Sequence, residues 1–209
     1  ICFDGRSLTR DRLVEVAYGA QVMLDEGALR NVAHAAAFLA EQVRREEPIY
    51  GVSTGFGSNA DKLLGAHPLR DELPGATPSG RSLHEELQRN LIVSHAVCVG
   101  EPFAADVVRA MLCIRINTLL RGHSGVRVQT LLGGGEAFHD GERLHGAEAL
   151  KRAGLAPVTL SYKEGLALNN GTAQMLATGV LALHRLEELL DTADLAAAMT
   201  IDAFAGRLG

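Results

Sequence analysis

The chain has 209 residues and a mass of 22.2 kDa, with 47% hydrophobic and 22% charged residues, a formal net charge of −5 and a pI near 5.9. This composition is ordinary for a globular protein, and it excludes the clustered basic face that nucleic-acid binding requires. Aromatic residues make up only 4%, so helices packed on helices are expected. Three widely spaced cysteines without a CxxC pair and the absence of a visible secretion signal predict a protein of the reducing cytoplasm, with no structural metal.

Apolar periodicity, with glycine and proline breaks, predicts a series of helices. The first predicted helix begins at Leu8-Thr9 and the second covers residues 25–45. Two more run from Ser82 to a stop at Gly100 and from Ala104 to a stop at Gly122, and the last covers residues 172–204. The last stretch is mostly Ala and Leu but carries several charged residues, so it is not a membrane span. A helix that is apolar on most sides is expected in the middle of a bundle or in a subunit interface. In the helix from Ala104, the spacing points Val107, Met111, Ile114 and Thr118 inward.

A glycine-rich stretch, Tyr50-Gly51-Val52-Ser53-Thr54-Gly55-Phe56-Gly57, follows the second predicted helix. Three glycines in seven positions favour a loop, because glycine adopts backbone angles that other residues resist. Such a loop could deliver the Tyr50 phenol into a closing site as an acid or base. The alternative is a plain surface turn with a buried Tyr and Phe as anchors.

The sequence Ser82-Leu83-His84-Glu85 has the S-x-x-E form of a capping box. Leucines then recur every fourth residue at 83, 87 and 91, and His95 holds the next position of that series. The spacing therefore predicts that His95 points into the protein. Without further information, a satisfied core histidine is the simpler interpretation.

Three other patterns are weaker indications of a functional site. Gly133-Gly134-Gly135 lacks a preceding strand and a following Lys-Ser/Thr, so it predicts a flexible turn and not a phosphate-binding loop. His139, Asp140 and His145 lie on a glycine-interrupted stretch without a defined ligand face, which favours solvated loop residues over a metal site. Asn170-Gly171 is a common turn pair, and Asn170 could simply cap the following helix.

Five motifs in this order resemble the aromatic amino acid ammonia-lyase family, and most closely its branch acting on histidine. The motifs are Y-G-V-S-T-G-F-G at 50–57, L-Q-R-N-L-I-V-S-H-A at 87–96, R-x-N-x-L-x-x-G-x-S-G-V-R at 115–127, G-A-E-A-L at 146–150, and K-E-G-L-A-L-x-N-G-T at 163–172. The resemblance implies a mostly α fold, the N-terminal portion of a long-helix bundle of the ammonia-lyase and fumarase-like type. It also implies a homotetramer with a small amino acid substrate. The implied reaction eliminates ammonia, with histidine giving urocanate, through methylidene-imidazolone (MIO), an electrophile made from an internal Ala-Ser-Gly.

The resemblance also assigns roles to residues at matching positions. Tyr50 matches the loop tyrosine that acts as the general base on the β-proton, and Gly57 and its neighbours would let the loop close over substrate. Asn170 matches the catalytic asparagine beside the MIO carbonyl or the substrate amine. His95, with Ser94 before it, matches the position that reads the substrate side chain, where an imidazole can exchange a hydrogen bond with a substrate imidazole.

The chain departs from the family pattern in two main ways. It contains no Ala-Ser-Gly, and Val128-Gln129-Thr130-Leu131 runs almost directly into Leu132-Gly133-Gly134-Gly135-Glu136. We therefore expect an internal segment to be missing near 131–132, and residues 1–209 to be the N-terminal part of a single lyase catalytic domain whose C-terminal half is absent. Ala173 also stands where relatives often carry Gln.

Several alternatives stay open from the sequence. The family also includes phenylalanine and tyrosine ammonia-lyases and aminomutases, and the distinction rests on Ser94-His95. A real polypeptide of this length could make no MIO and would serve as a helical binding or assembly module. A nucleotide-binding protein that uses the glycine-rich stretches ranks below both.

Overall fold

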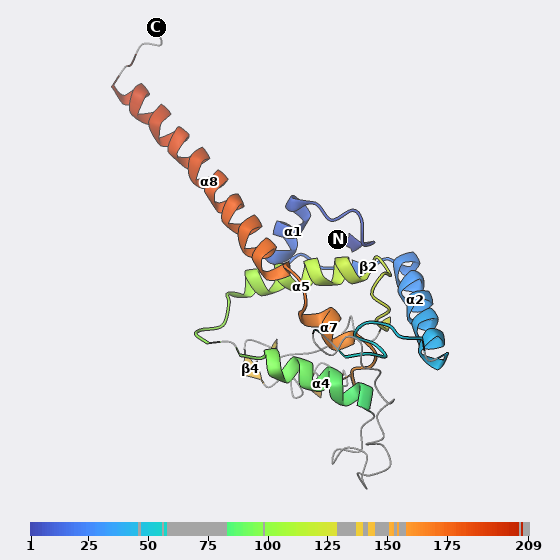
Figure 1. The fold of residues 1–209 in the computed structure, drawn as a ribbon. Coiled ribbons are helices and arrows are strands. Elements are labelled where there is room, and N and C mark those ends of the chain that lie inside the picture. Colours follow the sequence, from blue (N-terminus) through green and yellow to red (C-terminus); the bar gives the residue numbers. More distant parts are fainter. Residues whose placement is uncertain are drawn as a thin grey trace.

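The computed structural model describes residues 1–45, 47–55, 57, 83–97, 99–128, 137–139, 142–144, 151–152, 154, 158–204 and 206. These residues are mostly helical (Figure 1). The helices are α1 (Arg10–Ala17), α2 (Glu26–Arg44), α4 (Leu83–His95), α5 (Ala105–Leu119), α7 (Glu164–Asn169) and α8 (Ala173–Ala203). The expected mostly α fold is confirmed.

Two short strand pairs complete the described chain. Strands β1 (Cys2–Phe3) and β2 (Met23–Leu24) pair in parallel, and β3 (Ala137–His139) pairs antiparallel with β4 (Glu142–Leu144). The prediction that His139 belongs to a solvated loop is therefore wrong, because its backbone pairs with that of Glu142. Asp140, His145 and the three glycines at 133–135 lie outside the described residues. Within the described part of the chain, no group of three His, Cys, Asp or Glu side chains could hold a metal ion.

Polar side chains fix the start of the first two helices. The Thr9 side chain accepts a hydrogen bond from the Arg12 amide, and the Asp25 carboxylate accepts one from the Ala28 amide at 2.8 Å. Both bonds satisfy amides that a helix leaves unpaired at its first turn. The predicted beginnings of these two helices are confirmed. Ser82, the expected cap of α4, is outside the described residues.

The core lies where α1, α5 and the first turns of α8 pack together. Its most deeply buried side chains include Phe3, Leu13, Cys113, Leu120 and Leu181. Burial removes these apolar surfaces from water, which is the main stabilising contribution to such a core.

The inward face predicted for α5 is confirmed at three of four positions. Ile114 is buried, and Val107 and Met111 pack against the core. The prediction for Thr118 is wrong: this residue is exposed in the last turn of α5. Its hydroxyl donates to the Ile114 carbonyl at 2.8 Å, so it is satisfied within the helix and needs no core partner.

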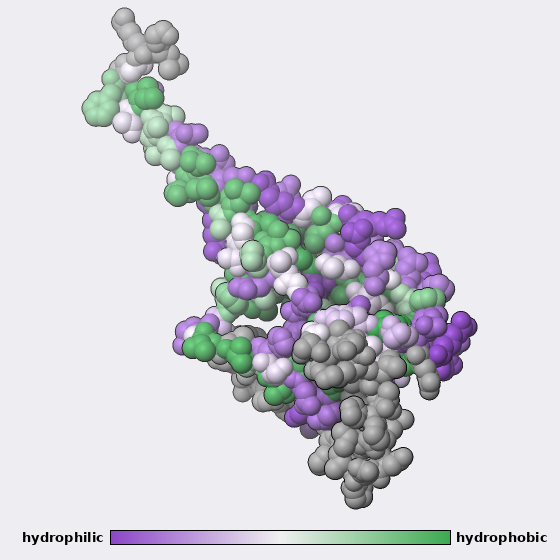
Figure 2. All heavy atoms as spheres, in the orientation of Figure 1, coloured by the Kyte–Doolittle hydropathy of each residue, from purple (hydrophilic) through white to green (hydrophobic). Residues whose placement is uncertain are grey.

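The longest helix, α8, extends well beyond the body of the molecule (Figure 1). Its start and length match the predicted helix over 172–204. Only Ala177 and Leu181 of α8 are fully buried, and Figure 2 shows apolar side chains along the extended part. The large apolar residues exposed there are Leu183, Leu186, Leu189, Leu190, Leu195, Met199, Ile201 and Phe204. Among the described residues, no helix meets the length and hydropathy that crossing a bilayer requires.

Gly5 lies where the N-terminal segment approaches the end of α5. Its amide donates to the Asn117 side chain at 3.1 Å, and its φ of +80° is a value that favours glycine. A Cβ there would lie 2.9 Å from the Arg121 backbone nitrogen. We expect Gly5→Ala to lower the free energy of unfolding by about 2–3 kcal/mol, from backbone strain plus this backbone clash.

Gly19→Ala is the matched control, because Gly19 also has a positive φ, +108°, but a Cβ there would meet nothing within 4 Å. Urea denaturation followed by circular dichroism measures both variants. Equal destabilisation by the two substitutions would contradict the role given to the contact with Arg121.

Candidate active site

The loop that carries Tyr50 is fixed by its own hydroxyl groups. Ser53 donates to the Glu47 carbonyl at 2.5 Å and accepts from the Ile49 amide at 2.8 Å, and Ser53 and Thr54 are buried. Tyr50 itself is 53% exposed, and its phenol oxygen accepts a long hydrogen bond, 3.4 Å, from the Gly57 amide. The alternative of a turn anchored by a buried tyrosine is therefore wrong for Tyr50. The expected loop presents its phenol outward, with Gly57 beside it.

His84, in the first turn of α4, joins this loop to the segment before α7. Its Nδ1 lies 3.1 Å from the Val52 carbonyl oxygen, and its ring meets the Tyr162 ring edge-on at 4.8 Å between centroids. Four residues further along α4, Gln88 is fully buried and accepts a hydrogen bond from the Gly165 amide at 3.0 Å. A Cβ on Gly165 would lie 2.8 Å from the Gln88 carbonyl oxygen, so only glycine permits this approach.

These contacts set the direction of α4 relative to α7. His84 meets Tyr162 and Gln88 meets Gly165, so the two helices run the same way along their contact (Figure 1). Ser94, His95 and Asn170 therefore lie toward the same end of the pair. The contact that holds the Tyr50 loop is at the other end of α4, about 15 Å away along the helix, since each residue adds about 1.5 Å.

Ser94 and His95 form a small exposed cluster at the end of α4. The Ser94 hydroxyl donates to the Leu91 carbonyl at 3.0 Å and lies 3.1 Å from the His95 Nδ1. The His95 Nδ1 is also 2.8 Å from the Leu91 carbonyl oxygen. A carbonyl accepts only, so this contact assigns a proton to Nδ1, and in the neutral ring the outer nitrogen, Nε2, is then an acceptor.

The predicted inward orientation of His95 is wrong. Each four-residue step exceeds one helical turn of 3.6 residues, so the direction advances by about 40° a step. His95 lies about 80° around the helix from Leu87 but only about 20° from the buried Gln88, so it is on the side of α4 that packs against α7. It is exposed because it is the last residue of α4, about two turns beyond the contact between Gln88 and Gly165. The apolar series predicted the helix correctly but not the end of its covered part.

Asn170 follows the last residue of α7 and is exposed. Its backbone carbonyl accepts a hydrogen bond from the Arg115 guanidinium at 2.8 Å. The N-cap of the next helix, α8, is Thr172, and the Thr172 side chain makes no capping hydrogen bond. The alternative in which Asn170 merely caps α8 is therefore wrong.

A surface pocket of about 260 Å³ lies beside Asn170. Its polar lining comes from the ends of α5 and α7 and the segments next to them: Arg115, Thr118, His123, Ser124, Lys163 and Asn170. Arg115 and Lys163 were not singled out from the sequence, although both lie in motifs that did stand out, at 115–127 and 163–172.

A buried carboxylate anchors the start of α7. The Glu164 side chain is 1% exposed and accepts hydrogen bonds from the Arg127 amide, Nε and Nη2 at 2.8–3.0 Å. It also accepts from the Ser161 amide at 2.6 Å. Glu164 raises the pKa of Arg127 through these hydrogen bonds, so the pair is charged. This ion pair ties the segment after α5 to the helix that leads to Asn170.

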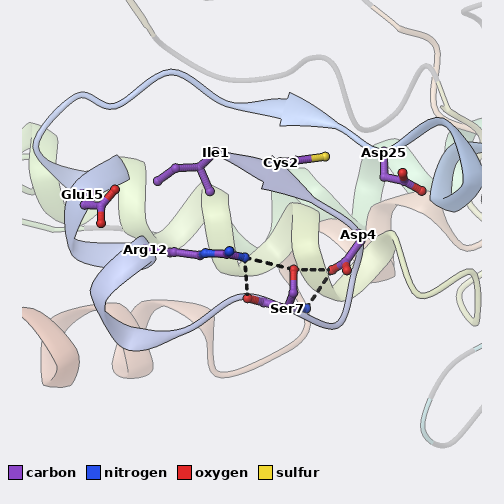
Figure 3. A pocket seen from close by; sticks show the side chains of 7 residues that line it. All are labelled: Ile1, Cys2, Asp4, Ser7, Arg12, Glu15 and Asp25. Carbon is purple, nitrogen blue, oxygen red and sulfur yellow. Dashed lines mark hydrogen bonds between the residues drawn. The ribbon is translucent and has the colours of Figure 1, made fainter.

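A second pocket lies near the N-terminus, between β1, α1 and β2 (Figure 3). Asp4, Glu15 and Asp25 line it together with Arg12. Hydrogen bonds from the Ser7 and Arg6 amides lower the pKa of Asp4 to about 2. None of the predicted site residues lies here.

Comparison with known proteins defines the class. A family model described as aromatic amino acid lyase matches residues 8–131 and 128–209. The chain belongs to the aromatic amino acid lyase family. A histidine ammonia-lyase of Symbiobacterium thermophilum is 42% identical over 237 residues, covering 95% of this chain and 44% of that protein. A histidine ammonia-lyase of Gloeobacter violaceus is 39% identical, and the alignment covers 99% of this chain and 45% of that protein.

Solved structures agree with the fold. Histidine ammonia-lyase from Trypanosoma cruzi superposes with a TM-score of 0.80 at 30% identity, covering 99% of this chain and 45% of that one. A tyrosine aminomutase from Streptomyces globisporus gives a TM-score of 0.80 at 28% identity, and the match covers 97% of this chain and 42% of that one. The chain spans less than half the length of these relatives.

Proposed function

We propose that this chain is the N-terminal part of a carbon–nitrogen lyase that eliminates ammonia from L-histidine to give urocanate. The observation that carries the proposal is the placement of Ser94-His95 and Asn170 toward one end of the α4–α7 pair, in a chain of this family. The names of several similar curated relatives support histidine as the substrate.

The chain's own residues would divide the work as follows. Tyr50 takes the β-proton of the substrate as the amino group leaves, and the electrons of that C–H bond form the double bond of the acrylate. Asn170 offers a side-chain amide that can hold the leaving amine. His95, with its Nε2 as an acceptor, receives a hydrogen bond from the imidazole N–H of histidine, and Ser94 fixes the ring. Bringing Tyr50 to these groups needs closure of its loop, which Gly57 and Gly51, both at positive φ, permit.

The residues present do not fit the MIO group. No Ala-Ser-Gly occurs in the 209 residues, so this electrophile cannot form from them. We propose that an internal segment near 131–132 carries it in the working enzyme. The family model matches in two parts that meet at 128–131. The Symbiobacterium alignment has 237 positions, whereas 95% of 209 residues is about 199, which leaves about 38 positions without a counterpart here.

A homotetramer is proposed as the working assembly. The exposed apolar side chains of α8 support it, because a monomer rarely leaves a long apolar face in water. A cytoplasmic location is proposed as well, supported by the free thiols of Cys2 and Cys113.

A second candidate is an aminomutase or lyase acting on tyrosine or phenylalanine, because the tyrosine aminomutase fold is as similar as that of the histidine enzyme. His95→Leu separates the two. If histidine is the substrate, the substitution should lower kcat/KM for L-histidine about tenfold, since the hydrogen bond from the substrate imidazole to His95 is lost. Turnover of L-phenylalanine should rise relative to that of histidine.

His34→Leu is the matched control, because His34 is exposed on α2, away from α4. It should leave both kcat/KM values unchanged. Wild-type protein that prefers tyrosine or phenylalanine, with His95→Leu neutral toward histidine, would favour the second candidate.

A further inference from the structure

The pocket beside Asn170 concentrates positive charge. Arg115 from α5 and Lys163 from the segment before α7 both line it. No Asp or Glu is among its lining residues in the described part of the chain. Such a surface attracts small anions, because no carboxylate among the described lining residues neutralises its cations.

Arg115 is held in place with no counter-ion among the residues that the structure describes. Its Nη1 donates to the Asn170 carbonyl at 2.8 Å, and its guanidinium lies so close to Gly171 that a Cβ there would be 2.7 Å from Nη2. None of the ion pairs formed by described residues involves Arg115. Burial lowers its pKa, as expected for a cation that is partly desolvated and not matched by a carboxylate. A bound anion would supply the missing charge.

Lys163 has a constrained backbone. Its φ of +62° lies in the left-handed region, and it is the one non-glycine residue with positive φ in the described part of the chain. This geometry costs on the order of 1 kcal/mol for a lysine and is held by its neighbours, because the Ala167 amide donates to the Lys163 carbonyl at 2.8 Å. The ammonium group has no ion-pair partner among the described residues.

We propose that this pocket binds a small oxyanion, a carboxylate or a phosphate, between Arg115 and Lys163. Ser124 can add a hydroxyl donor, whereas the Thr118 hydroxyl already donates to Ile114. A guanidinium and an ammonium with a hydroxyl between them are the groups that proteins use for such ligands. Binding here does not depend on the proposed lyase reaction.

Titration of the purified full protein with inorganic phosphate tests the proposal, with sodium chloride at equal ionic strength as the reference. Isothermal calorimetry should report one saturable site for phosphate that chloride does not reproduce. Lys163→Asn should weaken phosphate binding about tenfold by removing one charge-assisted bond. Asn tolerates a left-handed backbone better than most residues, so this variant should keep the fold.

Lys151→Asn is the control, because Lys151 is an exposed lysine outside the pocket lining. This substitution removes the same charge as Lys163→Asn. It should bind phosphate as the wild type does. Absence of saturable phosphate binding, or equal weakening by the two variants, would overturn the proposal.

Competition identifies the source of the anion. Urocanate carries a carboxylate, whereas histamine keeps the imidazole and lacks it. Displacement of phosphate by urocanate and not by histamine would assign the pocket to the carboxylate of a substrate or product. Phosphate binding that neither compound disturbs would assign it to a free anion.

Discussion

Replacing Tyr50 by Phe should lower kcat for L-histidine by at least about a hundredfold in the working enzyme, with little change in the stability of the protein. The size follows from the typical contribution of a positioned acid or base, about 10²–10⁴-fold. Stability should change little because the ring is retained, the side chain is 53% exposed, and the hydrogen bond from the Gly57 amide to the phenol oxygen is long, at 3.4 Å. Initial rates of urocanate formation measure the effect.

Tyr18→Phe provides the control for that experiment. Tyr18 is also about half exposed, at 54%, but it follows α1 and stands beside His184 of α8. Removal of its hydroxyl should leave kcat unchanged. A Tyr50→Phe enzyme as active as the wild type would remove Tyr50 from the reaction.

The second large effect concerns stability. Glu164→Gln should lower the free energy of unfolding by about 3 kcal/mol, because it leaves Arg127 without its buried counter-charge. This value is at the lower end of the usual cost of removing one partner of a buried ion pair, because the Arg127 side chain is 43% exposed while that of Glu164 is 1% exposed. The introduced amide would also place N–H groups against the donors that now surround the carboxylate. Urea denaturation gives the free energy directly.

Glu187→Gln is the matched control. Glu187 pairs with Arg10 at 2.7 Å, about as close as the 2.8 Å between Arg127 and Glu164, but both side chains are more than 40% exposed. Water and salt screen such a pair, so its loss should leave the stability close to that of the wild type. If the two substitutions destabilise the protein equally, burial is not what makes the Glu164 pair strong.

The helices could be predicted from sequence because local chemistry decides where they begin and end. Thr9 and Asp25 cap α1 and α2 through bonds to residues three positions on, which a short motif reveals. The length of α8 likewise follows from an unbroken Ala- and Leu-rich run. The short strands β3 and β4 escaped prediction, because each has only three residues and so carries too little periodicity.

The site was only partly predictable, because its key contacts join residues far apart in the chain. Glu164 meets Arg127 across 37 residues, and Arg115 meets Asn170 across 55. Neither pairing has a local sequence signal. The family motifs identified Tyr50, His95 and Asn170 as candidates, but the exposure of His95 depends on where α4 ends relative to its contact with α7.

One measurement tests most directly whether the protein is a histidine lyase with a further internal segment. L-histidine is given to the native protein, urocanate and ammonia are measured, and the intact mass of the same sample is recorded. We expect urocanate and ammonia in equal amounts from a polypeptide heavier than 22.2 kDa, because the 209 residues contain no Ala-Ser-Gly. A heavier polypeptide that leaves histidine unchanged would contradict the assigned substrate. Histidine turnover by a polypeptide of 22.2 kDa would contradict the need for a further segment.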